Sequence, residues 1–310
     1  MPQRYDDAHS FPNTGSPFNT ARFTFFTHCL LDDKDKFWRM IVLKTFILIL
    51  FACQTIYLSY AQRARYPVAA PYAGWGAYSK KFTDAFSSSY NQAALPDMPA
   101  FAAGVYGEQR FLMPGLHMFS LSLALNGRFG GFGLNAWYFG NQDLNESHLG
   151  LAYGKKLGDI NLGIQFDYRR YMAAGAGSEG AATFEIGAIW RISDRVRTGI
   201  HVFNPVGVSL PGRQENSPYA YHAGLGFEAS DQVFLCMQVI KEEGRPADIV
   251  AGLQYVFAGQ FFARIGMAAA ASLPFGSAGW KWESLRIEMA LSYHAQLGFS
   301  PGLALFYQPP

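Results

Sequence analysis

The stretch Asn161-Leu162-Gly163-Ile164-Gln165-Phe166-Asp167-Tyr168-Arg169 decides the fold class of this chain. Its even-numbered positions are apolar, whereas its odd-numbered positions are polar, charged or glycine. A strand with this two-residue period has one face suited to an apolar environment and one suited to a polar environment. Because the second face carries Asp167 and Arg169, it cannot belong to a hydrocarbon core. The pattern predicts a wall with lipid on one side and a polar lumen on the other.

The same alternation recurs along the chain, for example in 219–228, 261–267 and 285–294. We predict an all-β fold, a transmembrane antiparallel β-barrel of about fourteen strands. A soluble antiparallel sandwich also alternates, but it would have to bury every apolar face against a second sheet. The expected strands are 100–107, 116–125, 129–138, 147–156, 159–170, 182–192, 196–203, 218–228, 233–240, 247–257, 261–269, 276–282, 285–294 and 300–308.

The connections between these strands alternate between short turns and longer polar loops, as in outer-membrane barrels. The short turns centre on residues 126–128, 156–159, 193–195, 230–232 and 259–260. The expected longer loops are Glu108–Pro114, Phe139–Glu146, Met172–Ala181, Asn204–Ser217, Lys241–Pro246, Ala271–Gly276 and Ala295–Phe299. An even number of strands places both chain ends at the rim with the short turns.

Composition excludes two other classes of protein. Half of the 310 residues are hydrophobic and 15% are charged, yet no apolar run of the length of a membrane-spanning helix follows the N-terminal region. The formal net charge of +2 gives no electrostatic reason to expect a nucleic-acid partner.

The one long apolar run, Ile41–Tyr60, follows Met40 and includes Lys44. We interpret 40–61 as a signal peptide cleaved between Ala61 and Gln62, and 1–39 as an upstream segment absent from the mature protein. An inner-membrane anchor is one alternative. Lipidation at Cys53, after Leu50-Phe51-Ala52, is another.

Residues 62–99 do not alternate, and we expect them to form an N-terminal plug inside a barrel formed by 100–310. Prolines and glycines argue against a long regular element in this segment. Its aromatic residues would be unfavourable in free solution. They are Tyr72, Trp75, Tyr78, Phe82, Phe86 and Tyr90.

The hatch motif Asn91-Gln92-Ala93, which follows 84–90, resembles the N-terminal hatch of the fatty-acid transporter (FadL-like) barrels. Those families have proline where this chain has Gln92. The segments 201–205 and 292–301 are similar to the PorV/PorQ-type proteins of Bacteroidetes, a branch of the same superfamily.

This resemblance implies a plugged outer-membrane barrel that binds or passes small hydrophobic compounds. The PorV/PorQ branch implies, as an alternative, an accessory role in type IX protein secretion with secretion-system proteins as partners. A structural porin-like barrel is the third hypothesis. Other expected partners are outer-membrane lipid and the barrel assembly machinery, for which the C-terminal Leu303–Tyr307 looks like a recognition signal.

Enzymatic chemistry is not expected. The chain has no Gly-x-Ser-x-Gly elbow. Ser292 and His294 lie on one strand face and point in parallel, and the Gly-x-Gly-x-x-Gly match at 175–180 lacks a strand–turn–helix context. The histidines are scattered singly, so we predict no metal site and no cofactor.

Charged residues on the polar faces are expected to form ion pairs that fill the lumen or hold the plug, because unpaired charges there are too costly. These residues are Asp167, Arg169, Glu185, Arg191, Glu228, Arg264, Arg286 and Glu288.

Overall fold

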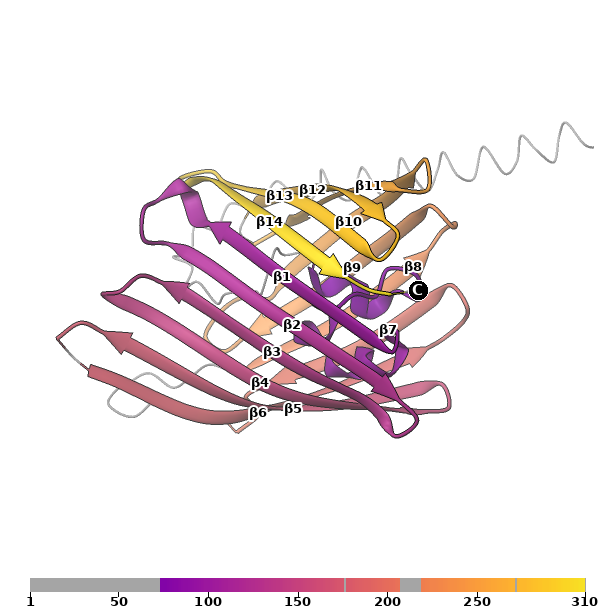
Figure 1. Cartoon of the computed structure of the whole chain (residues 1–310), viewed down its shortest axis with the longest axis horizontal. Helices are drawn as coiled ribbons and strands as arrows, with labels where there is room; N and C mark the ends of the chain where they lie inside the picture. Colours follow the sequence, from indigo (N-terminus) through magenta and orange to yellow (C-terminus); the bar gives the residue numbers. More distant parts are fainter. Residues whose placement is uncertain (1–72, 176, 207–218, 271, 310) are drawn as a thin grey trace, which may run out of the picture. The chain divides into compact units, whose positions relative to one another are not determined.

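The computed structural model describes residues 73–175, 177–206, 219–270 and 272–309. The described part of the chain forms a closed barrel of fourteen strands, each antiparallel to its neighbours (Figure 1). The strands are β1 (Phe101–Gln109), β2 (His117–Gly127), β3 (Gly130–Gly140), β4 (Leu144–Leu157), β5 (Ile160–Ala173), β6 (Gly177–Arg191), β7 (Val196–Phe203), β8 (Ala220–Glu228), β9 (Val233–Glu242), β10 (Asp248–Phe257), β11 (Phe261–Ala268), β12 (Leu273–Trp282), β13 (Leu285–His294) and β14 (Gly298–Tyr307). The predicted fold class is confirmed.

The barrel closes where β1 pairs with β14, from Ala103 opposite Tyr307 to Glu108 opposite Gly302. All other strand pairs join neighbours in sequence. We call the rim where β1 begins and β14 ends the terminal rim, and the opposite rim the loop rim.

The two faces of the wall differ as the alternation predicts. On β5, Leu162, Phe166 and Tyr168 point outward with 47%, 64% and 53% of their surface exposed. Their neighbours Gln165 and Asp167 point inward and are buried. Lipid can cover such a face at no cost, whereas in water it would be unfavourable.

Three predicted loops of the loop rim are wrong. Most of Phe139–Glu146 is strand, because β3 continues to Gly140, β4 begins at Leu144, and Phe139 lies opposite Glu146. Most of Met172–Ala181 is strand, because β5 continues to Ala173, β6 begins at Gly177, and Met172 lies opposite Ser178. Likewise β12 begins at Leu273, inside the loop expected at Ala271–Gly276. Small residues pair along a strand without giving an alternating signal, so the sequence pattern did not reveal these strand ends. The two rims therefore differ less in loop length than the sequence predicts.

Several predictions concern residues outside the described part of the chain. These are the upstream segment 1–39, the signal peptide 40–61 with its Ala61–Gln62 cleavage site, the lipidation alternative at Cys53, residues 62–72 of the plug and most of the loop Asn204–Ser217.

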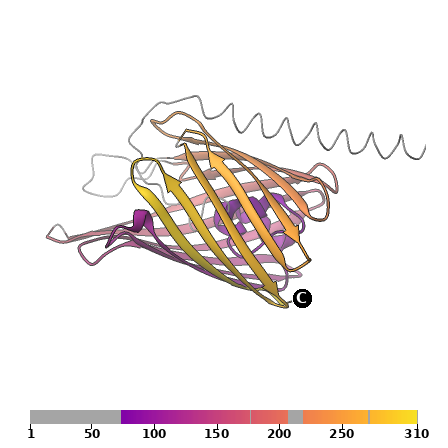
Figure 2. The same ribbon diagram turned by 90° about the horizontal axis from the view of Figure 1, so that it is seen from above.

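The described part of the N-terminal segment lies inside the barrel as three short helices (Figure 2). They are η2 (Ala73–Tyr78), α2 (Ser87–Tyr90) and η3 (Gln92–Asp97). Their aromatic and aliphatic side chains are buried, and Trp75, Phe86 and Leu95 are at most 2% exposed. None of the helices among the described residues has the length and hydrophobicity to cross a membrane. We call residues 73–99 the plug.

Glycines on the inner face of the wall make room for the plug. A Cβ atom at Gly163 would lie 2.3 Å from the backbone nitrogen of Ala93, and one at Gly252 would lie 1.8 Å from the ring of Trp75. A Cβ at Gly226 would lie 2.1 Å from the carbonyl oxygen of Tyr78. The inward glycines therefore allow a contact distance that no other residue permits. This close packing fixes the plug near the terminal rim.

Candidate functional site in the barrel lumen

The hatch motif connects the plug to the wall. The Asn91 side chain is fully buried; its Oδ1 accepts a hydrogen bond from the Ala93 N–H (3.1 Å) and its Nδ2 donates to the carbonyl of Ile200 on β7 (3.0 Å). Gln92 Nε2 donates to Glu185 Oε2 on β6 (2.5 Å). One turn of the plug thus binds two neighbouring strands. Both contacts are long-range, so only the structure could show them.

Beside this motif, a polar chain runs from the plug to the predicted residue Asp167. Ser89 Oγ donates to Asn135 Oδ1 (2.7 Å), and Asn135 Nδ2 donates to Gln165 Oε1 (2.7 Å). Gln165 Nε2 in turn donates to Asp167 Oδ1 (2.7 Å), which also contacts His148 Nε2 (2.7 Å). These hydrogen bonds join the plug to β3, β4 and β5 in the part of the lumen that the plug fills.

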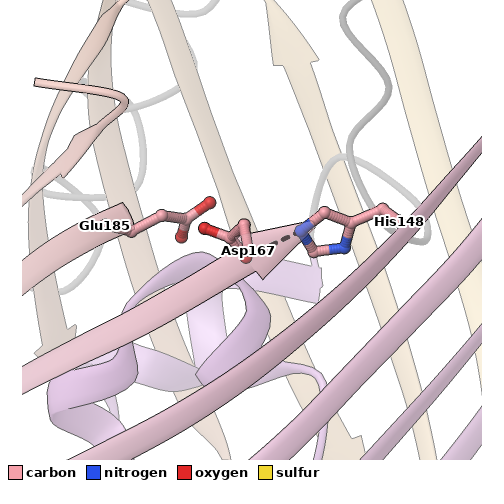
Figure 3. Close-up of side chains that lie close together, drawn as sticks. All are labelled: His148, Asp167 and Glu185. Atoms are coloured by element: carbon pink, nitrogen blue, oxygen red, sulfur yellow. Dashed lines mark hydrogen bonds and ion pairs between the residues drawn. The ribbon is translucent and has the colours of Figure 1, made fainter. Parts of the chain in front are cut away.

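Two inward histidines join the predicted carboxylates. His148 contacts Asp167, and His201 Nε2 lies 3.0 Å from Glu185 Oε2. One ligand atom from each of His148, Asp167 and Glu185 lies within 4.8 Å of the others (Figure 3). Sequence spacing missed this grouping, because strand pairing rather than proximity along the chain brings the residues together.

On the other side of the lumen, Arg264 and Arg286 bind the plug, and Glu288 pairs with both arginines. Arg264 Nη1 donates to Glu288 Oε1 (3.0 Å), and Arg286 Nη2 donates to Asp84 Oδ2 on the plug (2.5 Å). Arg264, Glu288 and Asp84 are all at least 96% buried. Asp84 completes the charge balance, and it was not among the predicted residues. Its signal was its place at the start of 84–90, the stretch that precedes the hatch motif.

Glu228 on β8 binds the plug by hydrogen bonds near the terminal rim. Its Oε1 accepts bonds from Ser79 Oγ (2.9 Å) and the Lys80 N–H (2.6 Å). Nearby, Lys81 donates to the exposed carboxylate of Asp231 in the β8–β9 turn, and this hydrogen bond lowers the pKa of Asp231.

A further ion pair joins the plug to the wall: Arg197 Nη1 lies 3.1 Å from Asp97 Oδ2. Neither residue was predicted.

Tyr78 of the plug packs against inward glycines of β7 and β8, and this burial raises the pKa of its hydroxyl.

The remaining two predicted residues lie apart from these contacts. Arg191, the last residue of β6, donates to the carbonyl of Gly158 and lies 3.9 Å from Asp159, so it belongs to the terminal rim. Arg169 lies on the loop-rim side of the plug, 3.5 Å from Glu146.

Arg169 belongs to an aromatic layer on that side. Its guanidinium lies over the rings of Trp137 (5.4 Å) and Phe203 (4.9 Å). Trp137 stacks on His148 with ring centroids 5.4 Å apart. Trp137 and Phe203 are 5% and 6% exposed. We use the name aromatic layer for Trp137, His148, Arg169 and Phe203.

The features weighed for catalysis do not form a site. His294 Nδ1 faces the backbone N–H groups of Gln296 and Leu297, both at 3.3 Å, rather than Ser292. In the segment 175–180, Gly177 onward belongs to β6, and no helix follows among the described residues. The nucleophile and dinucleotide motifs therefore lack their required geometry.

No protein-family model and no curated protein sequence matches the chain. Solved structures do match. A FadL homologue from Pseudomonas aeruginosa aligns with a TM-score of 0.55 and 13% identity over 76% of this chain and 97% of its own.

Two other barrels align to a similar degree. The CymD monoaromatic hydrocarbon channel gives a TM-score of 0.55 and 11% identity over 78% of this chain and 98% of its own. The Ralstonia pickettii toluene transporter TbuX gives a TM-score of 0.51 and 10% identity over 74% of this chain and 94% of its own. The chain has the fold of the FadL-like β-barrels: fourteen antiparallel strands closed around an N-terminal plug.

Proposed function

We propose that this protein is an outer-membrane barrel that binds small hydrophobic compounds and passes them across the membrane, without catalysing a reaction. The plug argues against an open, unselective porin, because its apolar core and ion pairs occupy the lumen near the terminal rim. The fold is shared with the hydrocarbon channel CymD and the toluene transporter TbuX, which supports an apolar substrate.

The observation that carries the proposal is the position of the aromatic layer beside the place where the described pairing of β6 with β7 ends. Pairing between β6 and β7 ends at Glu185 and Phe203, with one more bond from the Asn204 N–H to the Phe184 carbonyl. Residues Gly177–Thr183 of β6 therefore pair with β5 only, as far as the described residues show. Phe203, a member of the aromatic layer, lies at the end of this pairing.

This arrangement suits a compound that arrives from the lipid or the loop rim. Aromatic rings bury large apolar areas, and the nearby guanidinium of Arg169 adds attraction to a π-system or an anionic end. Below the layer the plug blocks the lumen, so passage requires the plug to shift.

The test uses the full-length protein in detergent and toluene as the probe, with wild type compared with Trp137→Ala. The matched control is Trp190→Ala, since Trp190 is on the outer face and 55% exposed. We expect Trp137→Ala to weaken toluene binding about 3–10-fold, and Trp190→Ala to leave it unchanged. Equal affinity in all three proteins, or no toluene binding by wild type, would contradict the proposal.

A further inference from the structure

Four inward residues lie on a diagonal across strands β4, β5, β6 and β7. His148 is opposite Arg169, two residues from Asp167. Asp167 is opposite Thr183, two residues from Glu185. Glu185 is opposite Phe203, two residues from His201. Each step along the diagonal has the same offset, which suits long side chains reaching across a tilted sheet.

The diagonal brings two carboxylates together in a buried place. The side chains of Asp167 and Glu185 are 0% and 7% exposed. In Figure 3 the two carboxylates face each other, and His148 lies on the far side of Asp167. Two like charges held this close away from water are unfavourable unless positive charge lies between them.

The hydrogen bonds of the cluster leave one oxygen aimed into this place. Asp167 Oδ1 is bound by both His148 and Gln165. The other oxygen, Oδ2, is buried and has no hydrogen-bond partner among the described residues. Asp167 is 97% buried, so bulk water does not solvate Oδ2. A buried carboxylate oxygen in this state is the group that a cation would satisfy.

We propose that His148, Asp167 and Glu185 bind a divalent first-row metal ion, of which zinc is the best match, with His201 next to the site as a further imidazole. Imidazole nitrogen and carboxylate oxygen are both donors that such ions accept. The ion would neutralise both carboxylates, and Asp167 Oδ2 would become one of its ligands.

The ligand atoms are near, but not at, the distances of a bound site. Zinc lies about 2.1 Å from each ligand, so in tetrahedral geometry two ligand atoms are about 3.4 Å apart. The three atoms lie within 4.8 Å of one another, so side-chain rotations must bring them closer when an ion binds. Gln165 and Gln92 already hold the carboxylates by hydrogen bonds of 2.7 and 2.5 Å, as outer partners of metal ligands do.

Gln92 belongs to the plug and donates to Glu185, so a metal bound by Glu185 would affect the plug as well as the wall. Through Glu185, an ion at this site would hold η3 against β6. Loss of the ion would weaken that attachment, and the stability of the plugged state would depend on the metal.

The experiment measures metal content and ligand geometry in the full-length protein, purified in detergent without a metal-affinity tag. We expect close to one zinc ion per folded chain by elemental analysis. After removal with a chelator, added Co²⁺ should give visible d–d absorption that Zn²⁺ displaces. Asp167→Asn should abolish this binding, and Gln92→Ala should weaken it about 10-fold or more. His117→Gln on β2 is the control and should bind as wild type does.

Cold-SDS mobility separates folded from unfolded barrels, so each variant is scored only on its folded fraction. Folded wild-type protein that holds no zinc and shows no cobalt absorption would overturn the proposal. Binding by folded Asp167→Asn equal to wild type would also overturn it. If Asp167→Asn is more stable to heat than wild type and added metal changes the stability of neither protein, the two carboxyl groups share a proton. That result would also overturn the metal site.

Discussion

The side chain of Asn91 donates a hydrogen bond of 3.0 Å to the carbonyl of Ile200, although the two residues are 109 positions apart. With its other end, Asn91 accepts from the Ala93 N–H and so begins η3. A single amide therefore determines where the plug helix starts and where it attaches to β7.

Replacing Asn91 by aspartate tests this double role. Aspartate keeps the acceptor for Ala93 but loses the donor, and it places a carboxylate against the Ile200 carbonyl. We expect a loss of about 1–3 kcal/mol or more in the free energy of unfolding, measured from urea titrations of cold-SDS mobility. The control is Asn141→Asp, because the exposed Asn141 side chain only accepts, from Asp143 and Leu144 N–H groups. Equal losses in both variants would contradict the assigned role.

The inward glycines give a second prediction. Gly163→Ala would force a Cβ to within 2.3 Å of the Ala93 nitrogen, so wall or plug must shift. We expect a cost of about 1–3 kcal/mol in unfolding free energy. Gly107→Ala is the matched change, since its Cβ would meet only the Phe119 ring at 3.6 Å. The stability of both variants is measured by thermal unfolding. If Gly107→Ala were destabilised and Gly163→Ala were not, the close contact between Gly163 and Ala93 would be refuted.

The buried ion pair gives a third prediction. Glu288→Gln removes the carboxylate that lies 3.0 Å from the buried Arg264 and leaves it only the more distant carboxylate of Asp84, at 3.9 Å, so it should cost about 3–5 kcal/mol. Asp159→Asn removes the partner of Arg191 at the rim, where Asp159 is 82% exposed, and should cost at most about 1 kcal/mol. Both are measured by urea unfolding. A small loss of stability in Glu288→Gln would mean that water in the lumen solvates Arg264, although the side chain is buried.

The outer face gives a fourth prediction. Phe166 is in the middle of β5 and faces outward, so Phe166→Arg should lower the stability of the folded barrel in lipid vesicles by about 2–4 kcal/mol. Leu157→Arg, at the terminal-rim end of β4, should cost about 0–1 kcal/mol. The measurement is the folded fraction after refolding into vesicles across a urea series. The reverse order of the two variants would show that β5 does not cross the lipid where its alternation predicts.

The sequence predicted the wall well because the two-residue period is local: Leu162, Phe166 and Tyr168 need no knowledge of their neighbours in space. It located the plug segment for a similar reason, from its aromatic residues. It failed at Met172–Ala181, where glycine, alanine and serine form strand without any alternation.

The lumen contacts depend on pairing register, which one strand alone does not determine. His148 and Asp167 are 19 residues apart, and Glu185 and His201 are 16 apart, spacings that carry no metal signature by themselves. Placing the short turns first and then counting back along each hairpin would have brought these residues together. The partners on the plug, such as Asp84 and Asp97, could not be assigned, because the path of 73–99 follows no regular period.

Phe86 of the plug meets both strands at which the barrel closes: its ring lies 5.5 Å from that of Phe306 on β14, and a Cβ at Gly104 on β1 would come within 3.0 Å of it. The β1–β14 pairing joins the two ends of the strand series, so its partners are farther apart in sequence than those of any other described strand pair. Closing a pair across such a long intervening chain has a high entropic cost. A plug side chain that packs on both strands offsets part of that cost by adding contacts at the seam of the barrel.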